Sequence, residues 1–526
     1  MTESSTLLFG VCVSLAAYIG LRIFSNDPKR FPLPPGPKGL PLLGNLKDLP
    51  PSGVLEAFHW LKHKDLYGPI SSVTVMGQTI VIINDAELAF DLLDKRSAKH
   101  SSRPTQIFAG EMIGWENSLA LSGYNDRFRT YRKNIARIIG SKTVAAQYDD
   151  LEEAEVSHFL LHVLDHPGQL IDHIRKEAGA IILKIAYGYR AEPLKEDLLI
   201  NMVGKAMDNF GTAAVPGAFL VDVMPFLRYL PDWIPGAGFK RLARQWASEL
   251  NDVAEKPYAF VQHQISHGKQ DNSLLAQLLE AGDSTDEEKI TNKWSAASLY
   301  AAGADTTVSA IACFFLAMSL FPNAQKAAQD EIDRVIGNDR LPTFTDRPNL
   351  PYIEALVKEV LRWHPVAPMG LPHTSTVEDI FAGYLIPKGS MVMANIWYFL
   401  HNPEVYDEPM RFKPERFLPI DGQPEQDPRA YVFGFGRRLC PGRVLAENTL
   451  FLNIAQSLAV FNVSTHENAT TREVLFTPGI VSHPESFQAT ITPRSVHHEK
   501  LIRRLEQKHP WETSDSHILY SMKTQN

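Results

Sequence analysis

A long apolar run between Trp294 and Phe321 constrains the fold of this chain more than any other feature of its sequence. Asp305 is the only charged residue in the run, and Pro322 follows it directly. A helix of this length and composition must be buried, either in a lipid bilayer or inside a large protein. The alanine, serine and threonine content of the run, with its central segment Gly303–Thr307, favours a helix that crosses a protein core. A membrane span is the alternative.

The composition of the whole chain supports a globular protein with a core large enough to surround such a helix. Of its 526 residues, 44% are apolar and 21% are charged, which is ordinary for a folded protein. The net charge of −8 has the wrong sign for bulk attraction to nucleic acid, so no nucleic-acid partner is expected. Three scattered cysteines are too few for a disulfide framework or a zinc cluster and indicate a reducing compartment: Cys12, Cys313 and Cys440.

The N-terminus carries a second apolar stretch. From Leu7 to Phe24 only Ser14 and Arg22 are polar, so residues 1–25 are expected to form a transmembrane anchor. A cleaved signal peptide is the alternative, although no basic segment precedes the stretch. Glu3 lies before it and basic residues follow it, which by the positive-inside rule places the rest of the chain in the cytoplasm.

The remaining chain is expected to form one large domain behind a short spacer. Residues 26–50 are rich in proline, which favours an extended and stiff hinge. No linker or repeat divides residues 51–526, and helical periodicity dominates there. A smaller β portion is predicted from alternation over Ile70–Asn84, which suggests a hairpin, and from β-rich pieces within Phe476–Arg494. The expected fold class is therefore mainly α with a smaller β portion.

The stretch Phe433–Gly442 is the strongest chemical motif. Its glycines permit tight turns, two arginines precede Cys440, and Pro441 suits the first turn of a helix. A cysteine at a helix N-terminus beside arginine is expected to have a lowered pKa and to persist as thiolate. Cys440 is therefore a candidate metal ligand or nucleophile, whereas Cys12 and Cys313 are expected to be small buried apolar residues.

A second motif lies on a predicted helix between Pro351 and Pro365. Glu359 and Arg362 are three residues apart, so they share a face and can pair. Such a pair is common on surface helices and is weak evidence alone. Downstream, Arg416 offers a further cation that could join it in a fixed network.

Together these motifs resemble a known family. The cysteine loop, the Glu359/Arg362 pair, Arg416 and the segment Ala302–Thr307 occur in the order and at the separations of a cytochrome P450. The anchor and hinge are similar to those of microsomal members, and the ending Val481–Pro484 looks most like fungal enzymes of secondary metabolism. The resemblance implies the cytochrome P450 fold, with haem between a long central helix and the cysteine loop.

The resemblance also implies roles for individual residues. Cys440 becomes the axial thiolate ligand of the iron of haem b. Phe433 packs beside it, while Arg132, Arg438 and His373 contact the haem propionates. Phe128 stands where the family has a tryptophan, which removes one N–H donor. For His373, a histidine in a surface loop is the alternative. The implied structural triad behind the haem consists of Glu359, Arg362 and Arg416.

The central helix supplies the implied catalytic residues. A lone aspartate in an apolar helix is costly unless it is paired or hydrated, and threonine can bond back to a carbonyl one turn earlier. The resemblance assigns Thr306 to hydrogen bonding of dioxygen and Asp305 to proton delivery. The alternative is a helix kink with a solvated acid.

The implied function is a haem-thiolate monooxygenase of the endoplasmic reticulum membrane. It would insert one oxygen atom from O2 into a lipophilic small molecule, using electrons from NADPH through NADPH–cytochrome P450 reductase. A basic stripe at Arg129, Lys133 and Arg137 is the expected docking surface for that reductase. Two alternatives are a haem-thiolate isomerase or dehydratase without external electrons, and a membrane-tethered haem carrier or sensor.

Overall fold

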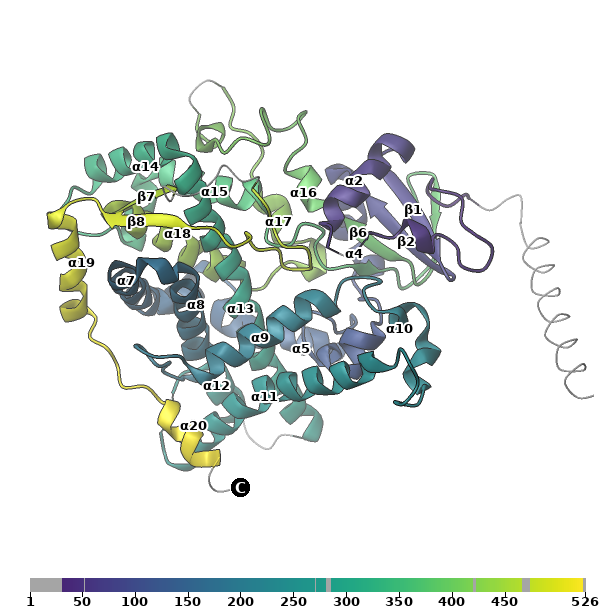
Figure 1. The fold of residues 1–526 in the computed structure, drawn as a ribbon, viewed down its shortest axis with the longest axis horizontal. Helices are drawn as coiled ribbons and strands as arrows, with labels where there is room; N and C mark the ends of the chain where they lie inside the picture. Colours follow the sequence, from purple (N-terminus) through teal and green to yellow (C-terminus); the bar gives the residue numbers. More distant parts are fainter. Residues whose placement is uncertain are drawn as a thin grey trace, which may run out of the picture.

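The computed structural model describes residues 31–51, 53–269, 271–280, 285–419, 422–465 and 474–523. These residues form a mainly helical body with small sheets near its two ends (Figure 1), which confirms the predicted fold class. The anchor predicted within residues 1–25 lies outside the described residues.

Helices account for most of the described chain. In chain order they are α2 (Glu56–Tyr67), α3 (Ala86–Phe90), α4 (Ser97–His100), α5 (Asp126–Ile139), α6 (Lys142–Ala145), α7 (Asp149–Asp165), α8 (Leu170–Tyr187), α9 (Leu198–Ala213), α10 (Leu220–Val223), α11 (Gly238–Ser266), α12 (Leu274–Glu280), α13 (Asp286–Leu320), α14 (Pro322–Val335), α15 (Pro351–Trp363), α16 (Ile396–Phe399), α17 (Arg429–Val432), α18 (Arg443–Val460), α19 (Val496–Lys508) and α20 (Ser516–Lys523).

The apolar run forms the long helix α13, as predicted. The helix begins at a capping box, in which the Thr285 hydroxyl accepts from the Glu288 N–H at 3.2 Å and the Glu288 carboxylate accepts from the Thr285 N–H at 2.8 Å. It ends where Pro322 opens α14. Although α13 is long and apolar enough to span a membrane, most of its side chains are buried inside the protein. It is therefore a core helix.

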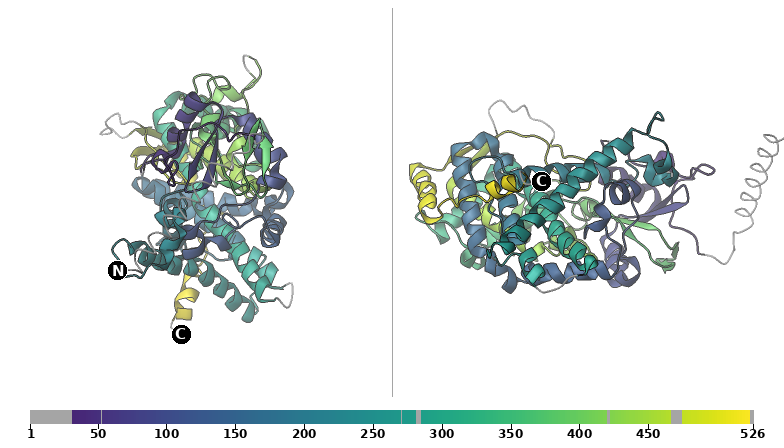
Figure 2. Two further views of the ribbon diagram at one scale, coloured as in Figure 1. Left: turned by 90° about the vertical axis from the view of Figure 1, so that its right-hand side faces the viewer. Right: turned by 90° about the horizontal axis from the view of Figure 1, so that it is seen from below.

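The other helices pack around α13 in two groups. Its C-terminal half shares a hydrophobic core with α7, α8, α15 and α18, and its N-terminal half shares another with α8, α9, α11 and α12. Helix α8 approaches most closely at Gly303, where an added Cβ would lie 2.7 Å from Ile182. Figures 1 and 2 show α13 running through the middle of this helical body.

The sheets contain the predicted hairpin and a strand within the β-rich region predicted near the C-terminus. Strands β1 (Ile70–Val75) and β2 (Gln78–Ile83) form the predicted antiparallel hairpin, and β6 (Met391–Ala394) adds to β2 in parallel, followed by β3 (His373–Thr374). Within Phe476–Arg494 only β8 (Ala489–Pro493) is a strand. The segment before it contains Pro478 and Pro484, which interrupt a ladder. The remaining strands are β4 (Asp379–Phe381), β5 (Tyr384–Ile386) and β7 (Phe461–Thr465), with β4 paired to β5 and β7 paired to β8.

The proline-rich stretch differs from the predicted spacer. The Pro32 carbonyl accepts from the Leu385 N–H at 2.8 Å, and the Pro34 and Pro35 carbonyls accept from the hydroxyl and the N–H of Ser72. Prolines hold the chain extended while leaving its carbonyls free to accept, so the stretch binds along β1. From Pro32 onward, the predicted hinge is part of the domain.

A buried carboxyl lies between α7 and α18. Glu152 is completely buried and accepts from the Thr449 hydroxyl at 2.7 Å, and this burial raises its pKa to about 8. A carboxyl with a raised pKa in the folded state opposes folding as pH rises, because the unfolded chain releases the proton above the ordinary pKa of 4.5.

Glu152→Gln is therefore expected to stabilise the protein increasingly between pH 5 and pH 8, on the order of 2 to 4 kcal/mol at the upper end. The measurement is the thermal unfolding midpoint of parent and variant across this range. Asp150→Asn, at an exposed position on the same helix, is the matched control. An E152Q advantage that does not change with pH would contradict the burial argument.

Candidate active site

A cavity of about 360 Å³ lies between α13 and the Phe433–Gly442 loop. Helices α8 and α9 and the segments Val366–Leu371 and Ile480–Val481 contribute to its wall, which is mostly apolar. Six residues predicted from the sequence line this one cavity: Arg132, Thr306, His373, Phe433, Arg438 and Cys440.

The loop around Cys440 is held by its own backbone. The Cys440 N–H donates to the Phe433 carbonyl at 2.8 Å, while Gly434 and Gly436 adopt positive φ angles of 80° and 51°. Gly436 also packs closely, because an added Cβ would lie 2.6 Å from the Leu93 carbonyl oxygen. The loop conformation that directs Cys440 toward the cavity therefore requires both glycines.

Two details of the predicted cysteine environment were wrong. Helix α18 begins at Arg443, with Gly442 as its N-cap, so Pro441 precedes the helix and does not lie in its first turn. Burial raises the pKa of the Cys440 thiol, and this outweighs the N–H groups of Gly442 and Arg443 and the nearby charge of Arg132, which all lower it. The free thiol is thus favoured until a metal ion replaces its proton.

Positive side chains converge beside Cys440. Arg438 donates to the carbonyls of Ser101 and Ser122 at 2.6 and 2.7 Å, and its guanidinium lies 3.8 Å from the centre of the Phe128 ring. Arg132 donates to the Leu439 carbonyl. Burial lowers the pKa of Arg438 to about 9, with a smaller contribution from Arg132. The phenylalanine in the place of tryptophan therefore forms a flat surface under Arg438.

Arg103 and His373 add to the cluster of nitrogen-bearing side chains at the cavity from other parts of the chain. Arg103 donates to the Ala120, Leu371 and Pro372 carbonyls at 2.7 to 2.9 Å, and burial lowers its pKa. His373 is buried, and its Nδ1 donates to the His100 carbonyl at 2.7 Å. Among the described residues, no carboxylate forms an ion pair with Arg103, Arg132 or Arg438. Arg438 is buried, and Arg103 and Arg132 are partly buried. Cations withdrawn from water without acidic partners indicate a site for an anionic ligand.

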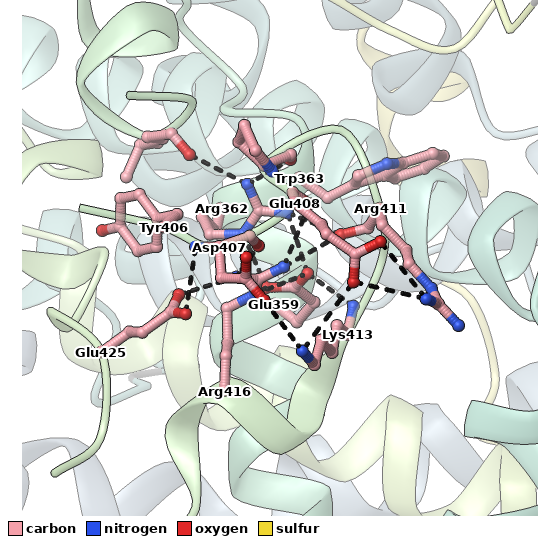
Figure 3. Close-up of polar contacts among 12 residues, drawn as sticks. Glu359, Arg362, Trp363, Tyr406, Asp407, Glu408, Arg411, Lys413, Arg416 and Glu425 are labelled. Atoms are coloured by element: carbon pink, nitrogen blue, oxygen red, sulfur yellow. Dashed lines mark hydrogen bonds and ion pairs between the residues drawn. The ribbon is translucent and has the colours of Figure 1, made fainter. Parts of the chain in front are cut away.

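The Glu359–Arg362 pair forms a compensated network behind the cavity. Arg362 makes two bonds to the Glu359 carboxylate, at 2.7 and 2.8 Å, and Arg416 approaches it to 3.3 Å. All three side chains are fully buried, and Figure 3 shows the contacts that join them. Glu425 completes the network by accepting from Arg416 at 2.7 Å. The network is satisfied internally, which suits a structural role rather than ligand binding.

The two predicted catalytic residues face different surroundings. The Thr306 hydroxyl donates to the Ala302 carbonyl at 2.8 Å, which is the expected bond to the preceding turn, and Thr306 lines the cavity. Asp305 is not part of the cavity wall that the described residues form. Its carboxylate lies 3.2 Å from Nε2 of His483. The lone acid of the apolar helix is therefore paired.

Sequence reasoning did not assign a role to Arg103, Glu425 or His483. Arg103 and His483 lie in loops, where no periodicity marks a side chain as inward-facing, and Glu425 lies in a polar segment that resembles ordinary surface. The one sequence signal was for His483, which lies in the segment Val481–Pro484 that resembles fungal members of the family.

The comparisons with known proteins decide the family. The cytochrome P450 family model matches residues 34–491. The chain belongs to the cytochrome P450 family. It is 48% identical to cytochrome P450 monooxygenase claR of Ampulloclitocybe clavipes, over 93% of this chain and 92% of that protein. It is 46% identical to cytochrome P450 monooxygenase ppsD of Aspergillus oryzae, over 93% and 94%.

The predicted likeness to fungal enzymes of secondary metabolism is also confirmed. The chain is 41% identical to O-methylsterigmatocystin oxidoreductase of Aspergillus flavus, over 97% of this chain and 98% of that protein. The resemblance thus covers nearly the whole length of both chains.

The residues at the cavity fit the haem that membership of this family implies. Haem carries two propionates, and the uncompensated cations Arg103, Arg132 and Arg438 supply the charge and the donors that two carboxylates need. Cys440 lines the same cavity and would hold the iron, with Phe433 beside it. When bound, haem supplies activation of dioxygen, which a cysteine thiolate ligand promotes.

Cys440→Ala is expected to abolish the thiolate-type absorbance of the carbon monoxide complex of the reduced protein, because the variant lacks the sulfur ligand. Cys313→Ala, which removes a buried cysteine on α13 away from the cavity wall, is the control and should keep that spectrum. The measurement is the reduced difference spectrum of purified protein. A parent-like spectrum in C440A would refute the assignment of the ligand.

Proposed function

We propose that this protein is a haem-thiolate monooxygenase that inserts one oxygen atom from O2 into a lipophilic small molecule. The observation that carries the proposal is the arrangement of one cavity: Cys440 and the cation group lie at one side, and Thr306 on α13 lines the same space. The names of the relatives describe monooxygenases and an oxidoreductase and support the same reaction class.

The chain's own residues would bind, orient and protect the reacting groups. Arg132, Arg438 and His373 would hold the propionates, while the apolar wall excludes water. Thr306 presents its hydroxyl at the cavity surface and is oriented by its bond to Ala302. A hydroxyl held in this way can exchange its hydrogen bond with a ligand oxygen and assist proton transfer there. Asp305, on the same helix, would deliver the protons.

An isomerase or dehydratase that needs no external electrons is the second candidate. Such chemistry requires no proton supply to dioxygen, so the adjacent Asp305 and Thr306 favour the monooxygenase. A haem carrier or sensor would need no large apolar space beside the iron, whereas this cavity extends along α8 and α9 to Ile182, Met207 and Phe210. Both alternatives predict no consumption of NADPH that depends on a substrate.

The cavity wall supports a lipophilic substrate. Apolar side chains from several elements line the same cavity as Cys440, among them Trp115, Ile182, Phe210, Leu299 and Val481. Burial of an apolar ligand against such a wall is favourable, and few charges are present there to bind a polar one. A secondary metabolite of a fungus is the proposed substrate class, in line with the name of the Aspergillus flavus relative.

Membrane association is proposed from the exposed apolar surface as well as from the predicted anchor. Leu220, Phe226 and Trp233 precede α11 in the chain and have exposed fractions of 57%, 60% and 81%. The N-terminal segment of the body exposes Leu40 and Leu42. The two segments are adjacent, because an added Cβ on Gly217 would lie 3.2 Å from Leu49. An apolar face of this kind suits the surface of the endoplasmic reticulum membrane, with the domain on the cytoplasmic side.

The test of the activity is reconstitution with NADPH–cytochrome P450 reductase and a panel of lipophilic fungal metabolites that includes O-methylsterigmatocystin. Product carrying oxygen from heavy-isotope dioxygen, formed only with NADPH, is expected. Thr306→Ala should bind haem and substrate normally yet release more peroxide and less product per NADPH, because its hydroxyl no longer assists proton transfer. Thr307→Ser, which changes the next cavity residue conservatively, is the control. Products that form equally without NADPH would favour the isomerase.

The reductase is proposed to dock on α5. Arg129, Lys133 and Arg137 are exposed on one side of this helix, and Arg132 on the same helix reaches the cysteine loop through Leu439. The basic stripe therefore lies on the same helix as a residue that contacts the cysteine loop. Such a patch would attract an acidic flavoprotein domain and speed its encounter at low salt.

Charge reversal at Arg129→Glu and Lys133→Glu is expected to slow reduction by the reductase about tenfold at low ionic strength, with a smaller difference at high salt. The measurement is the rate of reduction by rapid mixing. The matched control reverses Lys500 and Arg504, which are exposed at the same spacing on α19, far from α5. Equal rates for both double variants would exclude the stripe as the docking surface.

A further inference from the structure

The partner of Asp305 is a histidine from a distant segment. His483 lies in the segment that precedes β8 near the C-terminus, and its Nε2 is 3.2 Å from Oδ1 of Asp305. The His483 side chain is 25% exposed, whereas that of Asp305 is 11% exposed. The pair thus connects a nearly buried acid of the central helix to a group that water can reach.

The segment that carries His483 is fixed on several sides. The Ser482 N–H donates to the Val366 carbonyl at 2.9 Å, and the Ser482 carbonyl accepts from the Ser309 hydroxyl of α13 at 2.6 Å. The Ser482 hydroxyl bonds His364, and the His483 N–H donates to the Thr477 hydroxyl at 2.9 Å. The imidazole is therefore held beside Asp305 by its backbone, not by the ion pair alone.

Charged groups lead from this pair toward the surface. Asp208 on α9 is an exposed residue. Partial burial of its carboxylate and the nearby charge of Asp305 raise the pKa of Asp208, while the charges of Arg175 and His483 lower it. Arg175 on α8 is nearly half exposed. On the inner side, His364 also faces His483, and burial lowers the pKa of His364. Asp208, Arg175 and His364 are thus the titratable and charged groups around the pair.

The same segment contributes to the substrate cavity. Ile480 and Val481 line the cavity wall. His483 follows them after Ser482, whose carbonyl is hydrogen-bonded to α13. A proton supplied through His483 would therefore reach α13 on the side of Asp305, without crossing the apolar substrate space. This arrangement separates the wet path from the dry cavity, which a monooxygenase needs to avoid losing activated oxygen as peroxide.

We propose that His483 supplies Asp305 with protons from solvent and holds its carboxylate in position. The imidazolium gives the proton on Nε2 to the carboxylate Oδ1 of Asp305, which leaves a carboxylic acid and a neutral imidazole that keeps its proton on Nδ1. Once Asp305 has passed that proton on, a hydronium ion from solvent protonates Nε2 again and becomes water. Asp305 then serves the Thr306 side of the cavity. This inference rests on the proposed monooxygenase activity and identifies His483 as the group that reprotonates Asp305.

The test compares His483→Gln and His483→Ala with the parent holoenzyme, using the compound that the metabolite panel shows to be turned over. Glutamine keeps a donor toward Asp305 but cannot pass a proton on, so both variants should lose product per NADPH about tenfold and release more peroxide. This loss is smaller than the roughly hundredfold or larger contribution of a positioned acid itself, because water can partly replace the imidazole. The substrate dissociation constant and peroxide-supported turnover should not change.

A second measurement does not depend on turnover. Thermal unfolding midpoints of His483→Gln, Asp305→Asn and the double variant should be non-additive if the two side chains interact in the holoenzyme. The matched control is His497→Gln, because His497 pairs with Asp339 at the same 3.2 Å on the surface, away from the cavity. His497→Gln should leave the amount of product formed per NADPH unchanged.

Three outcomes would overturn the inference. Normal coupling in H483Q would reduce His483 to a structural partner, additive midpoints would show that the pair does not form, and an equal loss in H497Q would make the effect nonspecific. If the parent itself turns over no compound with NADPH, the proposed function fails instead, and the midpoints still report on the pair.

Discussion

Fully or partly buried positive charge, with no acidic partner in the part of the chain that the structure describes, is the constraint around which this active site is organised. Three arginines end beside one cavity: Arg103, Arg132 and Arg438. Their N–H groups donate to backbone carbonyls, which accept the hydrogen bonds but carry no negative charge to balance the cations. Burial opposes that charge, as the lowered pKa of Arg438 shows. A dianionic ligand removes this cost. Haem binding and the folding of the surrounding loops are therefore coupled by electrostatics as well as by the bond to Cys440.

The Glu359–Arg362–Arg416 network shows the opposite solution to the same problem. The side chains of its three central residues are fully buried, but Glu359 and Glu425 compensate the two arginines, and none of these residues lines the cavity beside Cys440. The contrast separates cations that hold the fold from cations that await a ligand. It also explains why the pair looked unremarkable in sequence: its importance lies in burial, which spacing alone does not report.

Helix α13 divides the chemistry of the protein into two sides. Thr306 lines the apolar cavity, while the side chain of Asp305, the residue before it, contacts His483. Successive residues on a helix point about 100° apart, so adjacent positions can serve a dry and a wet surface at once. The close crossing of α8 at Gly303 keeps this part of α13 in place.

The sequence by itself determined the core helix, the β1–β2 hairpin and the order of the cysteine, glutamate and arginine motifs, because periodicity, capping and short spacings are local properties. Only the tertiary structure decided that Arg103 joins the cations, that His483 pairs with Asp305, that Pro32 onward belongs to the domain, and that burial raises the pKa of Cys440. Each of these depends on segments far apart in the chain meeting in space, and on how much water their meeting excludes.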